Sequence, residues 1–427
     1  MHSYINANNS GYKLCCMSHI IGRWDTTGDI NEQFQAFWTS EEMQDIRLSF
    51  LADKMPTPCE WWCGRWEKEG LEHKSDRLKF LKKWLRDHPE LEWDIEHGNT
   101  NYKQPVDVDF RPSRKCNLKC RSCNSTWSDQ IEKEVKENPS IQGWGHWETP
   151  VFPQTYEMNL EFNHVKKLSM SGGETLVDEG VLEVIRKLVD EDRAKDIHLH
   201  MITNGTVLPK KTLDLLKEFQ KLTFALSIDG VGEADEFLRH GTKWEKKLKN
   251  IHTLFQLPNL WYIDIMHVFQ WISAFKIEEN FAFFQELDRL YGDKLLQVTY
   301  NPIVDPWYLS VSCLDQDHKD LMLETINNLE ATEKQKQWLK IAVSELTKTQ
   351  PEHLIATYQN DFVRANNALD EIRGESTLDI CPELQRYYDR YDPSDLTPDK
   401  GNGANPGAQF GGKPKPASSR RIDIRMQ

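Results

Sequence analysis

The feature that most restricts the fold of this chain is a regular alternation of strand-like and helix-like segments between Val106 and Tyr300. Each short apolar or alternating run is followed by a segment that is long enough to form a helix. The predicted strands are 106–110, 166–172, 196–203, 222–229, 261–269 and 295–300. Because parallel neighbouring strands are usually connected through a helix, this order predicts an α/β fold with a parallel sheet or barrel.

Four regions follow from this reading of the 427 residues. Residues 1–100 form an N-terminal region with four cysteines and helix patterns at 40–53 and 75–86, and residues 101–305 form the barrel. Residues 306–397 are mostly polar with helical periodicity, which predicts a helical C-terminal extension. Residues 398–427 are rich in Gly, Pro, Ser and Lys and poor in apolar side chains, which predicts a disordered tail.

The charge and the composition exclude some classes of function. The chain has 67 acidic and 53 basic residues, a net charge of −14, so its surface repels phosphate backbones and general nucleic-acid binding is disfavoured. We expect no membrane span, because no apolar run approaches about 20 residues. The N-terminal residues lack the basic and apolar regions of a signal peptide, so we expect a cytoplasmic protein. In that reducing compartment, clustered cysteines are more often metal ligands than disulfides.

Three cysteines lie close together directly after the first predicted strand. The segment RKCNLKCRSCNS (114–125) holds Cys116, Cys120 and Cys123. Three thiolates from one loop can bind three irons of a 4Fe–4S cluster and leave the fourth iron open, whereas a four-cysteine zinc or ferredoxin site closes every position. A structural zinc site with a fourth ligand elsewhere, or cysteines that only pack in the core, remain alternatives.

Further motifs end the next three predicted strands. SGGET ends the second strand with Gly172, Gly173 and Glu174. Two glycines allow close approach of a ligand to the backbone, and a carboxylate can accept a hydrogen bond from an ammonium group. TNGT (203–206) and SIDG (227–230) end the third and fourth strands, where barrels build their sites. Asn-Gly and Asp-Gly are also strong turn formers, so a purely structural turn remains open for each.

The cysteine triad, followed one strand later by Gly-Gly-Glu, resembles the radical S-adenosylmethionine (SAM) superfamily. The resemblance implies a partial (β/α)6 TIM-like barrel in which Cys116, Cys120 and Cys123 hold a 4Fe–4S cluster with SAM at its open iron. It also implies reductive cleavage of SAM to a 5′-deoxyadenosyl radical that abstracts hydrogen from a substrate. The enzyme would be oxidoreductase- or transferase-like.

The same resemblance suggests which residues contact SAM. Gly172, Gly173 and Glu174 would bind its amino group, and Arg239 would contact its carboxylate. Ser227 and Asp229 would line the ribose region, and Asn204 would contribute from the third strand. His267, on the fifth strand, is interpreted as a core histidine.

Residues 11–83 resemble the auxiliary-cluster region of radical SAM proteins with a twitch or SPASM-like domain. The matching residues are Cys15, Cys16, Trp38, Ser40, Arg47, Cys59, Cys63, Glu67 and Gly70. Adjacent side chains point apart in an extended strand, so we expect one of Cys15 and Cys16 to be a ligand and favour Cys16. The predicted ligands of this auxiliary iron–sulfur cluster are therefore Cys16, Cys59 and Cys63. The family usually has a further upstream cysteine that this sequence does not contain, so zinc, or no metal, remains an alternative.

The resemblance leaves the substrate open but is compatible with a peptide or protein. An electron donor such as flavodoxin or ferredoxin would be needed. The alternative function is a zinc- or iron–sulfur-binding interaction or electron-transfer protein without SAM cleavage. Under that alternative, Gly172, Gly173 and Glu174 would have no evident role.

Overall fold

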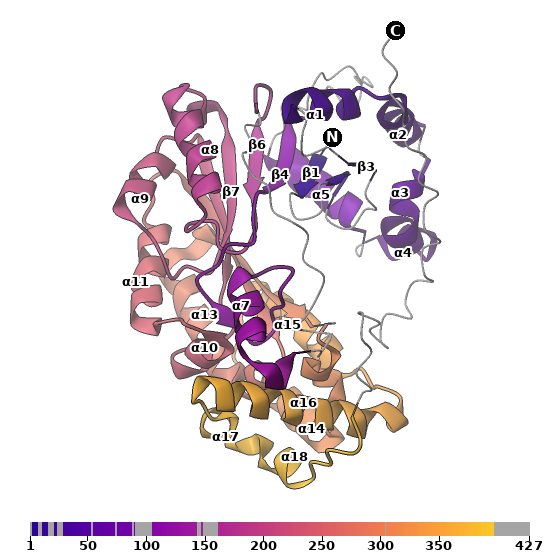
Figure 1. Cartoon of the computed structure of the whole chain (residues 1–427), viewed down its shortest axis with the longest axis vertical. Coiled ribbons are helices and arrows are strands. Elements are labelled where there is room, and N and C mark those ends of the chain that lie inside the picture. The colour runs from indigo at the N-terminus through magenta and orange to yellow at the C-terminus, as the bar shows by residue number, and fades with distance from the viewer. Residues whose placement is uncertain are drawn as a thin grey trace.

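The computed structural model describes residues 2–6, 11–15, 21–23, 29–52, 54–72, 75–87, 89, 105–142, 147, 161–303 and 305–396. Cys16 and the predicted tail at 398–427 lie outside these residues. Figure 1 shows a sheet flanked by helices, with the N-terminal helices beside one edge and the C-terminal helices beyond one end of the strands. Within the described residues, no helix is both long enough and apolar enough to span a membrane.

Six parallel strands form the central sheet, as the sequence predicted. They follow one another in chain order across the sheet, and each pairs in parallel with the next. The strands are β4 (Asp107–Arg111), β6 (Lys167–Met170), β7 (His198–Thr203), β8 (Lys221–Ser227), β10 (Leu260–Phe269) and β11 (Leu295–Pro302). This arrangement confirms the α/β class and puts the carboxyl ends of all six strands at one edge.

Three N-terminal strands extend the sheet beyond β4, which the sequence analysis did not foresee. The strand β1 (His2–Asn6) pairs in parallel with β4, and Tyr4 lies opposite Asp109. The strands β2 (Gly11–Lys13) and β3 (Gly22–Arg23) then pair antiparallel. In the part of the chain that the structure describes, the sheet therefore has nine strands in the order β11-β10-β8-β7-β6-β4-β1-β2-β3.

Helices between the strands cover the outer face of the sheet. For example, α8 (Glu179–Asp190) begins at Asp178, whose side chain accepts a hydrogen bond from Gly180 N, and it buries Val181 and Ile185. The others are α7 (Asp129–Glu137), α9 (Lys210–Leu216), α10 (Glu233–Leu238), α11 (Trp244–Phe255), α12 (Trp271–Phe275) and α13 (Ile277–Tyr291). A separate two-stranded ribbon joins β5 (Lys119–Cys120) and β9 (Arg239–His240).

The inner face of the sheet is more open than the outer face. Along β7, Leu199 and Met201 are fully buried in the core that the outer helices share. His200 and Ile202 point to the opposite face, and Ile202 is 39% exposed. The inner face therefore remains accessible near the carboxyl ends of the strands.

The C-terminal helices pack on the barrel. They are α14 (Gln316–Asn328), α15 (Glu333–Leu346), α16 (Glu352–Arg373), α17 (Thr377–Ile380) and α18 (Gln385–Asp389). Phe362 of α16 stacks on Trp271 of α12 with ring centroids 4.1 Å apart. The buried side chains of these helices belong to the same apolar core as the strands.

The N-terminal cysteine region has a small core of its own. Its helices are α1 (Ile30–Trp38), α2 (Glu41–Leu51), α3 (Thr57–Cys59), α4 (Arg65–Lys68) and α5 (Asp76–Asp87), and a π-helical turn, Glu60–Gly64, joins α3 to α4. Trp38, Met43, Ile46 and Cys59 pack together with Leu14. This core is separate from the large core beneath the sheet.

Candidate metal centre

The three cysteines of the triad lie in the loop between β4 and α7. Cys116 N donates a hydrogen bond to Asp129 Oδ1 at 2.9 Å, which ties the first cysteine to the start of α7. Cys120 ends β5, and Cys123 N donates to Cys120 O at 3.0 Å. The loop thus holds all three cysteines at the carboxyl end of the sheet.

The electrostatics of the thiols show that they lie close together. Burial raises the pKa of Cys116 to about 12, and the neighbouring Cys120 adds to this effect. Burial likewise raises the pKa of Cys123, with further contributions from Cys120 and Cys116. Because metal ligands must be thiolates, binding at this loop would release protons. Among the described residues, no three His, Cys, Asp or Glu side chains are placed to hold a single metal ion, but thiolates on a four-iron cluster bind different irons.

Gly172 and Gly173 lie directly beneath the backbone of the cysteine loop. A Cβ atom on Gly173 would stand 2.4 Å from Lys115 O and 2.5 Å from Arg114 O. Gly172 has φ +155°, and a Cβ there would stand 2.7 Å from Ser113 O. Any side chain at Gly173 would therefore displace the loop. The protein's own backbone thus approaches both glycines closely.

The Glu174 side chain connects the ends of β6 and β7. Its Oε1 accepts from Thr203 Oγ1 at 2.6 Å and from Leu176 N at 3.1 Å, and its Oε2 accepts from Asn204 N at 2.6 Å. Glu174 N also donates to Lys115 O at 2.8 Å. Burial raises the pKa of Glu174 despite these hydrogen bonds. The carboxylate of Glu174 therefore joins the two strand ends, and its backbone N–H ties them to the cysteine loop.

Asn204 connects the third strand end to the same loop. Its Nδ2 donates to Asn117 Oδ1 at 3.0 Å, and Asn117 Nδ2 donates to Thr206 Oγ1 at 2.8 Å. Asn117 follows the first cysteine of the triad. Asn204 is itself buried, with 3% of its surface exposed. The TNGT turn therefore supports the cysteine loop through these side-chain hydrogen bonds.

Asp229 and Arg239 form an ion pair beside the triad. Arg239 Nη1 donates to Asp229 Oδ2 at 2.6 Å, and Val268 N donates to Asp229 Oδ1 at 2.9 Å. Burial alone would raise the pKa of Asp229, but Arg239, His267 and these hydrogen bonds hold it below its usual range. In the β5–β9 ribbon, Arg239 lies opposite Cys120. The positive charge therefore stands next to the second cysteine.

The other predicted SAM residue, Ser227, is half-buried at the end of β8, level with Met266 of β10. The structure thus gathers Arg239 and Asp229 beside Cys120, and Asn204 and Glu174 against the base of the loop. His267 is buried, and its Nδ1 lies 2.8 Å from Ile228 O. That contact braces the turn that carries Asp229.

A second buried ion pair behind Asp229 was missed by the sequence analysis. Lys247 Nζ donates to Asp235 Oδ2 at 2.6 Å, and both side chains are 0% exposed. Asp229 N donates to Asp235 Oδ1 at 3.0 Å, which joins the two pairs. Burial lowers the pKa of Lys247, which Asp235 opposes. No sequence signal marks this pair, because its members come from different helices, α10 and α11.

The N-terminal cysteines also gather. Burial raises the pKa of Cys59 to about 12, with further contributions from Cys15 and Cys63. Arg77 N donates to Cys63 Sγ at 3.3 Å. The structure thus places Cys15 next to Cys59 and Cys63, whereas Cys16, which we favoured from the sequence, lies outside the described residues.

Polar residues that matched the auxiliary-cluster pattern brace this region. Arg77 makes two hydrogen bonds to Glu67, at 3.2 and 2.6 Å, and Ser75 Oγ donates to the same carboxylate at 2.6 Å. Arg47 is buried, and its Nη2 donates to Trp38 O at 2.6 Å. The Glu67 contacts tie α4, which follows the turn with Cys63, to α5, and the Arg47 contact joins α2 to α1.

The residues around the triad fit an iron–sulfur cluster with an anionic ligand. The three thiols come from one loop, and Cys120 adds to the burial that raises the pKa of Cys116 and of Cys123. Arg239 Nε is buried and has no hydrogen-bond partner among the described residues, so its N–H group can donate to a ligand. A carboxylate bound there would satisfy that donor.

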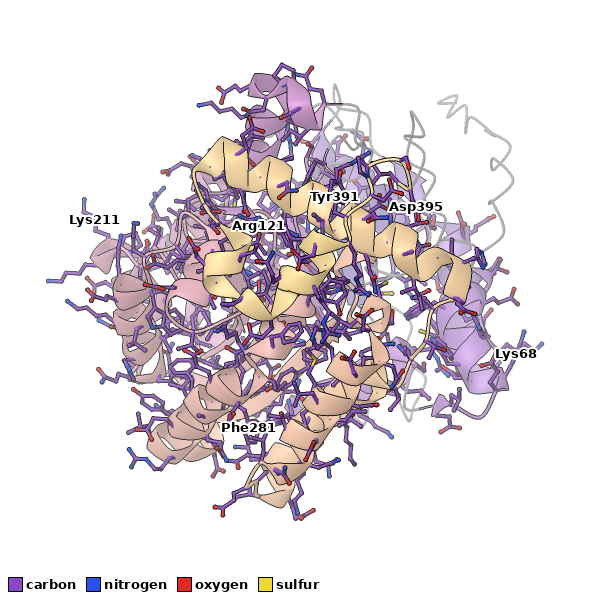
Figure 2. The ribbon with its side chains drawn as sticks, turned by 90° about the horizontal axis from the view of Figure 1, so that it is seen from below. Lys68, Arg121, Lys211, Phe281, Tyr391 and Asp395 are labelled. Atoms are coloured by element: carbon purple, nitrogen blue, oxygen red, sulfur yellow. The ribbon has the colours of Figure 1, made fainter. Side chains whose placement is uncertain are left out.

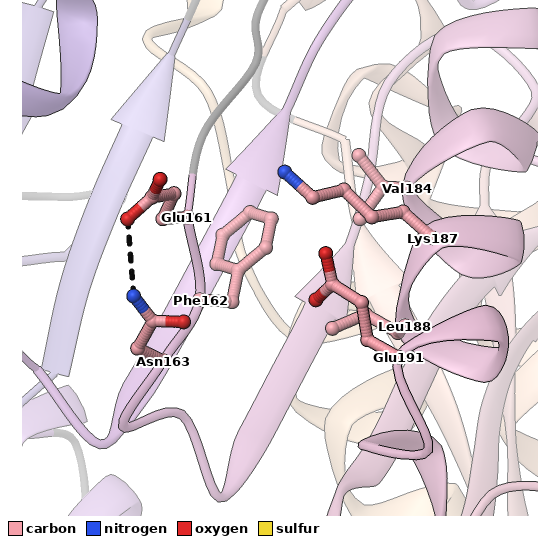
Figure 3. Close-up of a pocket in the computed structure, with 7 residues that line it drawn as sticks. All are labelled: Glu161, Phe162, Asn163, Val184, Lys187, Leu188 and Glu191. Carbon is pink, nitrogen blue, oxygen red and sulfur yellow. Dashed lines mark hydrogen bonds between the residues drawn. The ribbon is translucent and has the colours of Figure 1, made fainter.

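A pocket elsewhere on the barrel lacks this chemistry. It lies between α8 and the segment that leads into β6 (Figure 3). That segment precedes β6, whereas Gly172 follows the strand. It is lined by Glu161, Phe162, Asn163, Val184, Lys187, Leu188 and Glu191. None of these is a cysteine or a predicted SAM contact.

Comparison with known proteins identifies the domain that carries the triad. Residues 110–268 match the family model of the radical SAM superfamily. The antilisterial bacteriocin subtilosin biosynthesis protein AlbA of Bacillus subtilis (strain 168) is 28% identical over 135 residues, which cover 31% of this chain and 26% of AlbA. The match thus spans about a quarter of that curated relative.

Solved structures that are similar include SuiB of Streptococcus suis, with 16% identity and a TM-score of 0.33, which covers 77% of this chain and 69% of SuiB. Native anSMEcpe with bound AdoMet has 18% identity and a TM-score of 0.33, and covers 64% and 68% of the two chains. From its family match and its cysteine triad, the chain contains a radical SAM domain, and residues 110–268 belong to the radical SAM superfamily.

Proposed function

We propose that this protein is an enzyme that cleaves SAM reductively at a 4Fe–4S cluster held by Cys116, Cys120 and Cys123. When bound, the cluster supplies the electron that cleaves SAM, and the resulting 5′-deoxyadenosyl radical abstracts hydrogen from the substrate. The observation that carries this proposal is that Arg239 lies opposite Cys120 in the β5–β9 ribbon and that its Nε–H group is buried without an acceptor among the described residues. A carboxylate-bearing ligand at the open iron would meet that charge.

The other predicted residues have roles that follow from their contacts. Arg239 would bind the SAM carboxylate while Asp229 fixes its orientation through the 2.6 Å hydrogen bond. Glu174 and Asn204 would hold the cysteine loop in place, which is a positioning role. Backbone atoms at Gly172 and Gly173, together with the half-buried Ser227, would line the approach to SAM.

For the N-terminal region we propose an auxiliary iron–sulfur cluster bound by Cys59, Cys63 and one of the adjacent cysteines. The support is that Cys15 and Cys63 both lie close enough to Cys59 to add to the burial that raises its pKa. Zinc at Cys59, Cys63 and one of the adjacent cysteines is the alternative, although among the described residues no three side chains are placed to hold a single ion. We assign residues 1–100 to this region, 101–305 to the barrel, 306–397 to the helical extension and 398–427 to a tail.

We propose a peptide or protein as the substrate. AlbA is named for the biosynthesis of a bacteriocin, which agrees with peptide chemistry. A reduced flavodoxin or ferredoxin would serve as the electron donor. An oxygen-sensitive cluster of this kind suits the reducing cytoplasm, which we propose as the location.

The test begins with anaerobic purification and reconstitution with iron and sulfide. The protein is then reduced with dithionite and mixed with SAM, and 5′-deoxyadenosine and iron per chain are measured. The matched control replaces Cys116, Cys120 and Cys123 by Ala. Product in the wild type alone supports the proposal. Bound zinc, without iron or product, would favour the alternative of a zinc-binding interaction protein.

A further inference from the structure

Arg121 lies between Cys120 and Cys123 in the sequence, but its side chain contacts the C-terminal helices. It follows Cys120 directly, and its side chain is 2% exposed. Its Nη1 donates to Asn366 Oδ1 at 2.9 Å, and its Nη2 donates to Asp370 Oδ1 at 2.5 Å. Figure 2, seen from below, shows Arg121 among the ribbons of these helices. A residue between two predicted cluster ligands is therefore anchored about 250 positions away in the sequence.

The end of α16 contacts both strands of the ribbon that carries Cys120. Arg121 Nη2 also donates to Glu375 Oε2 at 2.7 Å. The other oxygen of that carboxylate, Oε1, lies 2.6 Å from His240 Nδ1. His240 belongs to β9 and follows Arg239. One carboxylate thus connects the strand that carries Cys120 to the strand that carries Arg239.

The anchoring carboxylates are themselves held in place. Gly374 ends α16 with φ +64°, a left-handed conformation that glycine adopts readily, and this turns the chain so that Glu375 faces Arg121. Asp370 Oδ2 accepts hydrogen bonds from Thr377 N at 2.7 Å and Thr377 Oγ1 at 2.8 Å. Because both acceptors are fixed, the Arg121 backbone and its neighbours in the loop are fixed with them.

We propose that Arg121 is a positioning residue for the cluster, through which helix α16 sets the spacing of Cys120 and Cys123 relative to Arg239. This inference rests on the proposed SAM-cleaving function. Neither Arg121 nor α16 needs to touch SAM for this role. A shift of about 1 Å in a catalytic group can lower a rate by about a hundredfold.

The test compares Arg121→Met with Arg373→Met. Arg373 makes two hydrogen bonds to Glu134 of α7, at 3.2 and 2.7 Å, and these side chains are 1% and 2% exposed. It therefore supplies an equally buried ion pair from the same helix. Glu134 Oε1 also lies 3.3 Å from Lys119 Nζ, so this pair reaches the cysteine loop through a lysine side chain that is 31% exposed, whereas the Arg121 side chain is 2% exposed. Both variants are reconstituted anaerobically and measured below their unfolding midpoints, which are determined first. The readouts are 5′-deoxyadenosine formation and the change in the electron paramagnetic resonance spectrum of the reduced cluster when SAM is added.

We expect Arg121→Met to lose the spectral response to SAM and to form product about a hundredfold more slowly, while Arg373→Met keeps both close to wild type. Arg121→Lys should recover part of the response, because it keeps the charge but not the fork of donors. If Arg121→Met does not fold, Glu375→Gln removes one of its two carboxylates and is measured in the same way. Equal spectra and rates in the Arg121 and Arg373 variants would overturn the inference. A wild type that forms no product would instead overturn the proposed function on which it rests.

Discussion

The two groups of cysteines differ in how deeply the ion pairs beside them are buried. Beside the triad, the Arg239–Asp229 and Lys247–Asp235 pairs are almost fully enclosed. Beside Cys59 and Cys63, the charged pair is Arg77–Glu67, with side chains 27% and 18% exposed. A buried charge is stable only where its partners are fixed. The triad is therefore built into a rigid polar core, whereas the N-terminal cysteines depend mostly on a small apolar one.

Replacing the cysteines of each region should give the largest difference between the two regions, measured as formation of 5′-deoxyadenosine. Replacing Cys116, Cys120 and Cys123 by Ala should reduce 5′-deoxyadenosine to background, because no other described loop offers three thiols beside Arg239. Replacing Cys15, Cys59 and Cys63 should leave cleavage of SAM without substrate measurable. Product analysis by chromatography checks this expectation. Loss of product in both variants would mean that the two regions are not separable.

Breaking the buried pair behind the triad should be costly for stability. Lys247→Met leaves Asp235 buried without its counter-charge, which should lower the free energy of unfolding by about 3–5 kcal/mol. Adding Asp235→Asn should restore most of the loss, because the amide oxygen can still accept from Asp229 N. Denaturant unfolding of the apo protein measures both variants. A double variant as unstable as the single one would contradict this account of the pair.

The pH dependence of thiol reactivity should differ from that of an exposed cysteine. Burial raises the pKa of Cys116 and of Cys59 to about 12, so the thiolate fraction of each should rise about tenfold per pH unit between pH 8 and 11. An ordinary cysteine with a pKa of about 8.5 levels off in this range. Alkylation of the apo protein, followed by peptide mass spectrometry, gives the rate for each cysteine. A plateau near pH 9 would contradict the raised pKa of both thiols.

The smallest effect is expected at the N-terminal ion pair. Arg77→Met removes two hydrogen bonds from Glu67, but both side chains reach solvent, so the loss of stability should be about 1 kcal/mol. The same unfolding experiment measures it beside Lys247→Met. A loss as large as that of Lys247→Met would remove the difference between the two regions.

The sequence predicted the six parallel strands because each is a local pattern. In β8, residues 222–226 form a continuous buried run, which is typical of a strand covered on both faces. The strands β1, β2 and β3 are two to five residues long. They carry no pattern of this kind, and the partner of β1 lies far along the chain. Their place in the sheet could not be predicted from local sequence.

The candidate site was also predictable only where it depends on residues that are close together in the sequence. The spacing of Cys116, Cys120 and Cys123 is local and predicted the loop. The contacts of Lys247 with Asp235 and of Arg121 with Asp370 join separate elements, so no spacing of residues in the sequence predicts them. The contact of Gly172 and Gly173 with SAM stays a prediction, whereas the close packing of these glycines against the backbone of residues 113–115 joins separate segments and could not be predicted from the motif.

The pairing of β1 with β4 has a consequence for biosynthesis. Asp109 follows Tyr4, its partner in the register, by roughly 100 residues, which a ribosome adds in about 5–20 s. During that interval the first strand of the chain has been made but the edge that receives it does not yet exist. β2 follows within a few residues and can pair with one edge of β1 early, but the edge that β4 later covers stays open to chaperones or to premature pairing throughout that interval.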